Sequence, residues 1–167
     1  MSTSLPERIR PLRLARRGES LAGRMPVAGM ARLRESLYSD AGEVTVDLRF
    51  YRDEEGHHRI GGTVRGTLEV VCQRCLGPLS VDVDSAVRLE IRDEDAMQPE
   101  DEYEPLLVGG EYVSLRDLVE DELILALPSY PRHARGACRI AAQYRPEPNA
   151  ESGERQRPFD VLAKLKR

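Results

Sequence analysis

The chain is poor in aromatic residues: its 167 residues include no tryptophan, two phenylalanines and six tyrosines. Leucine and valine must therefore supply most of the hydrophobic core, and a chain of this length can bury one. No apolar run approaches the roughly 20 residues that a membrane-spanning helix needs. Residues 1–8 also lack the apolar stretch of an export signal. We therefore expect a cytoplasmic protein that is not inserted in a membrane.

Cysteine is scarce as well, with only Cys72, Cys75 and Cys138 present. An odd number of cysteines without an export signal argues against a disulfide framework and for a reducing compartment. The three cysteines are therefore expected to be free thiols or metal ligands.

Charge is distributed unevenly along the chain, although the net charge is only −4. Residues 1–34 contain eight arginines against two glutamates, and residues 129–167 contain nine basic against four acidic residues. Between them, residues 82–122 contain fifteen acidic residues against three arginines. Arginine makes bidentate contacts to phosphate, so basic termini suggest RNA binding. The alternative is a solvated surface whose charges pair within the protein. The candidate RNA-binding residues are terminal arginines: Arg8, Arg10, Arg13, Arg16, Arg17, Arg132 and Arg135.

The most informative local pattern is Cys72-Gln-Arg-Cys75, followed by Gly77-Pro78 and flanked by two stretches with strand-like alternation. A turn that directs two thiolates the same way at the tip of a hairpin is half of a structural zinc site. In thiol oxidoreductases the reactive pair lies instead at the start of a helix, where the dipole lowers the thiol pKa. The position of this pair favours metal binding over redox chemistry.

Two further ligands are available about 60 residues on, at His133 and Cys138. Cys72, Cys75, His133 and Cys138 would form a tetrahedral Cys3His set without an open position, which predicts one structural zinc and no catalytic role for it. Two alternatives remain: reduced thiols beside a surface histidine, or a thiol-redox enzyme with an acidic cysteine.

Alternation of apolar and polar residues predicts strands over residues 44–50, 60–71 and 79–92. The last is long, with apolar residues on odd positions interrupted only by Ser85, so we expect it to be curved. A short strand is predicted over 103–108, with Gly109-Gly110 as a hairpin turn to 111–113.

One main helix is predicted over residues 115–127, with Ser114 as its N-cap and Pro128 ending it. Its apolar positions form one stripe, and Glu120 and Asp121 are expected to face water. This acidic face is either solvated or binds a basic partner such as a ribosomal protein. The candidate partner-binding residues on it are Asp117, Glu120 and Asp121.

The fold class we expect is α+β: a curved, barrel-like antiparallel sheet packed by one main helix, with Arg-rich N- and C-terminal arms. The expected division has three parts. Residues 1–42 form an Arg-rich arm with a short helix, and residues 43–128 the sheet and helix core. Residues 129–167 form a Cys/His-containing segment with a disordered stretch at 145–157 and a short terminal helix.

No motif indicates an enzyme. The sequence has no Ser-His-Asp arrangement that suggests nucleophilic catalysis, no phosphate-binding loop and no calcium-binding pattern. We therefore expect no catalytic residues and no small-molecule substrate.

Five segments, in this order, resemble the YceD family, the large ribosomal RNA subunit accumulation proteins of bacteria and plastids. They are residues 21–26, 71–78, 115–128, 131–138 and 158–166. The resemblance spans nearly the whole chain and departs from the family pattern only at 145–157. It implies a non-enzymatic role in the accumulation or processing of 23S ribosomal RNA. The expected partner is ribosomal RNA or a large-subunit ribosomal protein; the alternative is a protein-interaction adaptor with a zinc knuckle and no RNA contact.

Overall fold

The computed structural model describes residues 5–92 and 103–138. The expected disordered stretch at 145–157 and the expected short terminal helix lie outside these residues. The elements follow in this order: β1 (Arg8–Ile9), α1 (Pro11–Arg17), β2 (Ser20–Pro26), α2 (Ala31–Arg34), β3 (Leu37–Ser39), β4 (Glu43–Arg52), β5 (His58–Val71), β6 (Pro78–Arg92), β7 (Glu104–Leu107), β8 (Val113–Ser114) and α3 (Leu115–Ala126).

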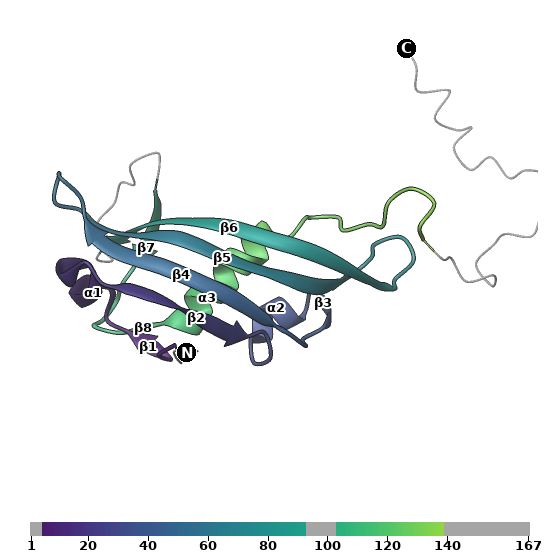
Figure 1. The fold of residues 1–167 in the computed structure, drawn as a ribbon, viewed down its shortest axis with the longest axis horizontal. Coiled ribbons are helices and arrows are strands. Elements are labelled where there is room, and N and C mark those ends of the chain that lie inside the picture. The colour runs from purple at the N-terminus through teal and green to yellow at the C-terminus, as the bar shows by residue number, and fades with distance from the viewer. Residues whose placement is uncertain (1–4, 93–102, 139–167) are drawn as a thin grey trace, which may run out of the picture.

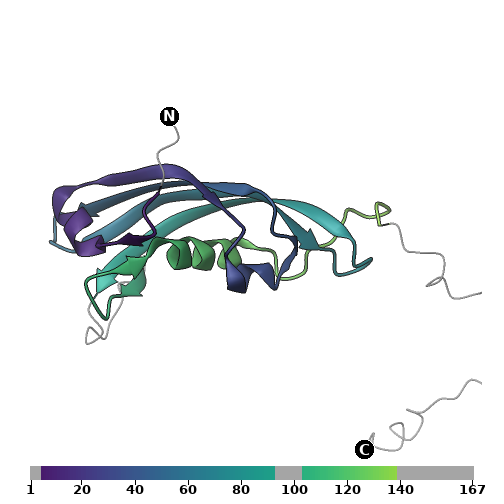
Figure 2. The same cartoon turned by 90° about the horizontal axis from the view of Figure 1, so that it is seen from below.

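The fold is α+β and is built mostly from one twisted sheet, in the order β2-β4-β5-β6-β7, with β3 paired to β5 (Figure 1). The sheet is open at β2 and β7, so the expected barrel-like closure is wrong. It is also mixed, because β7 pairs parallel to β6 while the other pairs are antiparallel. The helices lie on one side of the sheet (Figure 2).

The three long strands follow the predicted alternation. In β4, Val44, Val46, Leu48 and Phe50 are buried and the residues between them are mostly exposed. In β6, the odd positions from Val83 to Ile91 are buried except for Ser85. Because side chains alternate between the two faces of a strand, each strand contributes one apolar face to a common core under α3.

Helix α3 covers the apolar face of the sheet through Leu115, Leu118, Val119 and Leu123. Its N-cap is Ser114, whose side chain accepts the backbone N–H of Asp117 at 3.2 Å, as predicted. The helix ends at Ala126, close to the predicted end, because Pro128 cannot continue it. None of the helices formed by the described residues is long and apolar enough to cross a membrane.

The N-terminal segment that we expected to be an Arg-rich arm with a short helix is instead largely part of the folded core. Strand β2 pairs with β4 from Ser20 opposite Arg49 to Pro26 opposite Glu43, so it forms an edge of the sheet. Helix α1 precedes it and ends at Gly18, whose φ of 64° suits glycine. Pro11 lies in the first turn of α1, and Gly23 and Pro26 lie on the edge strand β2, so these residues do not make the segment an unstructured arm.

The predicted hairpin at Gly109-Gly110 does not form. Strand β7 pairs with β6, and β8 pairs with β1, with Val113 opposite Ile9 and Ser114 opposite Arg8. The short strand β8 therefore connects β1, near the start of the chain, to helix α3. No local sequence pattern signals such a long-range pairing.

Candidate functional site

The two cysteines of the Cys-x-x-Cys segment lie on a tight turn between β5 and β6. The N–H of Cys72 donates to the carbonyl of Gly77, and the N–H of Leu76 donates to the carbonyl of Cys72, each at 2.9 Å. Leu76 has a φ of 58°, the left-handed conformation that lets the chain reverse here. The turn is therefore a knuckle at the tip of a hairpin, and no helix begins at either thiol.

The segment after α3 brings the other two candidate ligands to this turn. The N–H of Gln73 donates to the carbonyl of Pro131 at 2.8 Å, which ties the segment to the knuckle. A turn at residues 134–137, with Gly136 at a φ of 89°, then returns the chain so that His133 and Cys138 face the same point. All four predicted ligands thus lie together, although the two pairs are far apart in the sequence.

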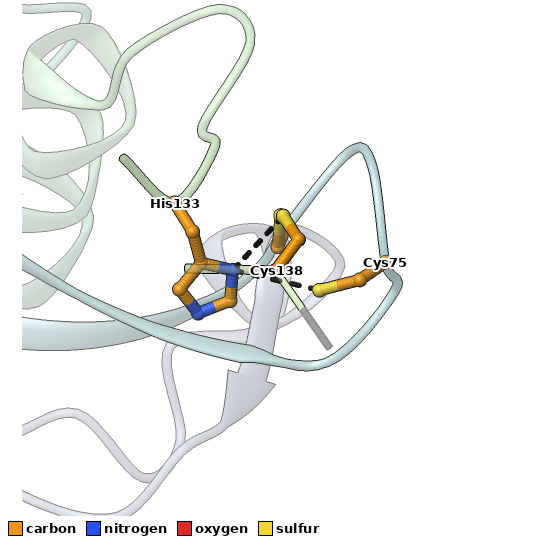
Figure 3. Close-up of side chains that lie close together, drawn as sticks. Cys75, His133 and Cys138 are labelled. Atoms are coloured by element: carbon orange, nitrogen blue, oxygen red, sulfur yellow. Dashed lines mark hydrogen bonds between the residues drawn. The ribbon is translucent and has the colours of Figure 1, made fainter. Parts of the chain in front are cut away.

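The four donor atoms lie within 4.8 Å of one another. Figure 3 shows the Nδ1 atom of His133 directed at the sulfurs of Cys75 and Cys138, at 3.4 and 3.7 Å. The sulfurs of Cys72 and Cys138 are 3.7 Å apart. Ligands about 2.3 Å (sulfur) and about 2.0 Å (nitrogen) from one zinc would be separated by about 3.8 and 3.6 Å along the edges of a tetrahedron. The cluster therefore has the dimensions of a tetrahedral zinc site.

The second nitrogen of His133 is oriented by the backbone. Its Nε2 lies 3.0 Å from the carbonyl oxygen of Pro78, which can only accept, so Nε2 carries the proton and the lone pair of Nδ1 is available to a metal. Metal-binding histidines almost always donate their other N–H to such an acceptor. The ring is thus held in the tautomer that a metal requires.

The electrostatics of the cluster favour a thiolate at Cys72. Burial alone would raise the pKa of Cys72, but the backbone N–H groups of Cys75, His133 and Arg74 oppose it and bring the pKa to about 5. Burial and the neighbouring sulfurs of Cys72 and Cys75 raise the pKa of Cys138. Three sulfurs this close together repel one another as thiolates, and a cation between them removes that repulsion.

The predicted RNA-binding arginines form two groups at opposite ends of the sheet (Figure 1). Arg8 lies on β1, Arg10 directly precedes α1, and Arg13, Arg16 and Arg17 lie on α1. Arg10 pairs with Glu111 and Arg17 with Glu19, each at 3.2 Å. Arg8, Arg13 and Arg16 have no acidic partner within the part of the chain that the structure describes.

The second group, Arg132 and Arg135, is exposed on the segment that carries His133 and Cys138. Arg74, which our sequence analysis did not include, is also exposed here, and its Nη1 lies 3.8 Å from the sulfur of Cys138. A metal at the cluster would therefore fix the position of a small basic surface.

The predicted acidic face of α3 is only partly available. Glu120 is 4% exposed, so the expectation that it faces water is wrong. Its carboxylate accepts the backbone N–H groups of Arg32 and Leu33, and the Arg32 side chain pairs with Asp121 at 2.5 Å. Asp117 remains exposed at the helix start beside Arg32, whose Nη2 reaches its carbonyl at 3.2 Å. The α2 segment thus neutralises much of this face.

Two groupings were not among the predicted site residues, and the first of them forms only in three dimensions. Tyr112 lies beside Arg8 and Arg10, with the guanidinium carbons 5.1 and 4.5 Å from the ring centroid. Asp53, Glu55 and His57 gather in the turn after β4. Asp53 already pairs with Arg59 at 2.8 Å and accepts the N–H of His57, so we assign no metal there.

The protein is thus an open α+β sheet with a Cys3His cluster that could hold a metal ion at one end and a group of arginines at the other. The chain belongs to the YceD family: the family profile, described as "Large ribosomal RNA subunit accumulation protein YceD", matches residues 60–166. A Haemophilus influenzae protein of that name is 32% identical over 171 aligned positions, covering 97% of this chain and 96% of the relative. No solved structure matches the chain.

Proposed function

We propose that this protein is a non-enzymatic, cytoplasmic factor for the accumulation of large-subunit ribosomal RNA, and that it binds this RNA directly. The family and the named relative supply the process. The observation that supports direct binding is the group of arginines on β1 and α1. Arg8, Arg13 and Arg16 carry positive charges that no described acidic residue neutralises.

The arrangement of α1 suits contacts with a phosphate backbone. Arg13 and Arg16 lie three residues apart, so their side chains project from the same face of α1. Guanidinium groups bind phosphate in a bidentate manner and release counterions when they do so. Binding should therefore weaken steeply as the salt concentration rises.

We also infer that the Cys3His cluster holds one structural zinc. Zinc with four protein ligands has no open position, so its contribution would be to join residues 131–138 to the β5–β6 turn. The separations of the donor atoms and the orientation of His133 support this inference. Arg132 and Arg135 would then be held as a second point of contact with RNA.

The proposal is tested by fluorescence anisotropy with a labelled large-subunit RNA fragment across a salt series. The double variant Arg13→Glu, Arg16→Glu should lose more than about tenfold in affinity, because two phosphate contacts become repulsive. The single variant Arg24→Glu is the control for a charge reversal outside both groups of arginines, since Arg24 lies on β2 and pairs there with Glu43.

The result that would overturn direct RNA binding is an absence of binding by the folded wild-type protein at low salt. That outcome would favour the adaptor hypothesis, in which exposed acidic residues such as Asp117 contact a basic ribosomal protein. In cells that lack the protein, the wild-type chain and Arg24→Glu should restore the level of large-subunit RNA, and the double variant should not.

A further inference from the structure

A cavity of about 310 Å³ lies at the basic end of the molecule, between β1, α1 and the loop before β8. Its wall contains Arg8, Arg10, Arg13 and Arg17 together with Tyr112. The pairing of β1 with β8 is what brings Tyr112, a residue distant in sequence, to these arginines. The volume falls at the lower end of the range of small-ligand pockets, about 300–1,000 Å³.

The charge of the wall is strongly positive. Glu19 is the acidic residue among the lining side chains, and it pairs with Arg17. Glu111, near the cavity, pairs with Arg10. Arg8 and Arg13 have no acidic partner in the described ranges 5–92 and 103–138, so they are available to an anionic ligand.

The wall also offers surfaces on which a planar group can stack. The ring of Tyr112 is partly exposed, and the guanidinium groups of Arg8 and Arg10 already lie against it. Arg10 also donates a hydrogen bond to the Tyr112 hydroxyl, which positions both side chains. Leu14 and Leu21 add apolar surface to the same cavity. Nucleobases stack on tyrosine rings and on guanidinium planes, and phosphate pairs with arginine.

We propose that this cavity binds one unpaired nucleotide of an RNA strand. The base stacks against Tyr112 and the guanidinium groups beside it, and the adjacent phosphate pairs with Arg13. A paired base cannot enter, because the bases of an A-form duplex are stacked inside the helix. This inference rests on the proposed function and adds to it a preference for single-stranded RNA.

The test compares a labelled single-stranded RNA with its duplex, by fluorescence anisotropy at two salt concentrations. Tyr112→Ala should weaken single-strand binding about tenfold, the typical loss of one stacked base, and leave duplex binding unchanged. The salt dependence should stay the same, because the ring carries no charge. Tyr112→Phe keeps the ring and should bind within about twofold of wild type.

Arg13→Ala should weaken binding and reduce the slope of log K against log salt by about 0.7, the value for one phosphate contact on a single strand. Arg24→Ala is the control and should alter neither quantity. Thermal melting of each variant shows that the fold is intact, since Tyr112 is 42% exposed and its truncation removes little of the core.

The outcomes separate the two hypotheses. If the wild-type protein binds no RNA, the proposed function fails and this inference fails with it. If the wild-type protein binds RNA but folded Tyr112→Ala binds single strands equally well, only the nucleotide pocket is overturned. An equal loss of affinity for single-stranded and duplex RNA would also overturn the nucleotide pocket. The ring would then contribute only to contacts with the phosphate backbone, which both forms of RNA have.

Discussion

The carboxylate of Glu120 on α3 accepts the backbone N–H of Leu33 on α2 at 2.9 Å. The same oxygen accepts the N–H of Arg32 at 2.7 Å, and both hydrogen bonds are shielded from solvent by the burial of Glu120. One side chain therefore supplies acceptors for two backbone donors at the start of a four-residue helix that has no side-chain N-cap.

We expect Glu120→Ala to lower the free energy of unfolding by about 3 kcal/mol, because two donors lose their acceptor in a poorly solvated place. Glu120→Gln keeps an acceptor oxygen and should cost about 1 kcal/mol. Asp121→Ala, which removes an exposed partner of the same Arg32, should cost less than about 1 kcal/mol. Urea denaturation measures the free energy of unfolding of all three variants. Equal losses for Glu120→Ala and Asp121→Ala would show that the two backbone hydrogen bonds of Glu120 contribute little to stability.

Two adjacent glycines in β5 should respond very differently to substitution. A Cβ on Gly62 would lie 2.0 Å from the carbonyl oxygen of Asp47, and the φ of Gly62 is +148°. Gly62→Ala should therefore destabilise the protein by more than about 3 kcal/mol. A Cβ on Gly61 would meet the ring of Tyr51 at 3.4 Å, so Gly61→Ala should cost about 1 kcal/mol or less. Comparable melting temperatures for the two variants would contradict this difference.

The metal inference predicts one zinc per chain in protein purified without chelator or affinity metal. Native mass spectrometry should find the zinc in wild type and in Arg74→Ser, since Arg74 lies in the turn but is not a ligand. Cys72→Ser and Cys138→Ser should both lose it, because each removes one of four ligands. Retention of zinc in either cysteine variant, or its absence from wild type, would contradict the assignment.

Removal of the metal should act locally. The segment 131–138 is attached to the knuckle by the Gln73–Pro131 hydrogen bond and by the ligands, whereas the sheet has its own core. Chelation should therefore accelerate tryptic cleavage after Arg132 and Arg135 by more than about tenfold and leave the far-ultraviolet circular dichroism of the sheet unchanged. Loss of the sheet signal on chelation would show instead that the metal stabilises the whole fold.

Glu122 on α3 predicts a stability change with pH. Burial raises its pKa above the usual value of 4.5, and Glu104 and Asp121 raise it further, against the hydrogen bond that Ser85 donates at 2.8 Å. The folded state therefore holds this proton more tightly than the unfolded state does. The stabilisation of the folded state that comes from this tighter proton binding is fully present below pH 4.5. It is lost as the pH rises through the pKa of Glu122 in the folded state.

Glu122→Gln should therefore be more stable than wild type at pH 7, and the advantage should vanish below pH 4.5. Glutamine keeps an oxygen that can accept the Ser85 hydroxyl. Urea midpoints of both proteins, measured from pH 4 to pH 8, test this prediction. A stability difference that is constant with pH would show that the ionisation of Glu122 does not affect the stability of the fold.

Much of the core could be predicted from local patterns. The alternation in residues 44–50 and 79–92 identified β4 and β6, and Ser114 and Pro128 located both ends of α3. The predictions of barrel closure, of a wholly antiparallel sheet, of a hairpin at Gly109-Gly110 and of an N-terminal arm were wrong. Each of these depended on which strands pair, and an edge strand such as β2, with glycine and proline, carries little apolar alternation.

The sequence by itself determined the three long strands β4, β5 and β6, helix α3 and the four residues that could bind a metal, because periodicity, capping residues and Cys/His spacing are local properties of the chain. Only the tertiary structure decided that His133 and Cys138 reach the knuckle, that Glu120 is buried beneath α2, and that Tyr112 lies beside Arg8 and Arg10. The physical reason is that these contacts join residues tens of positions apart. Their partners are selected by how the sheet and α3 pack together, and no local pattern encodes that choice.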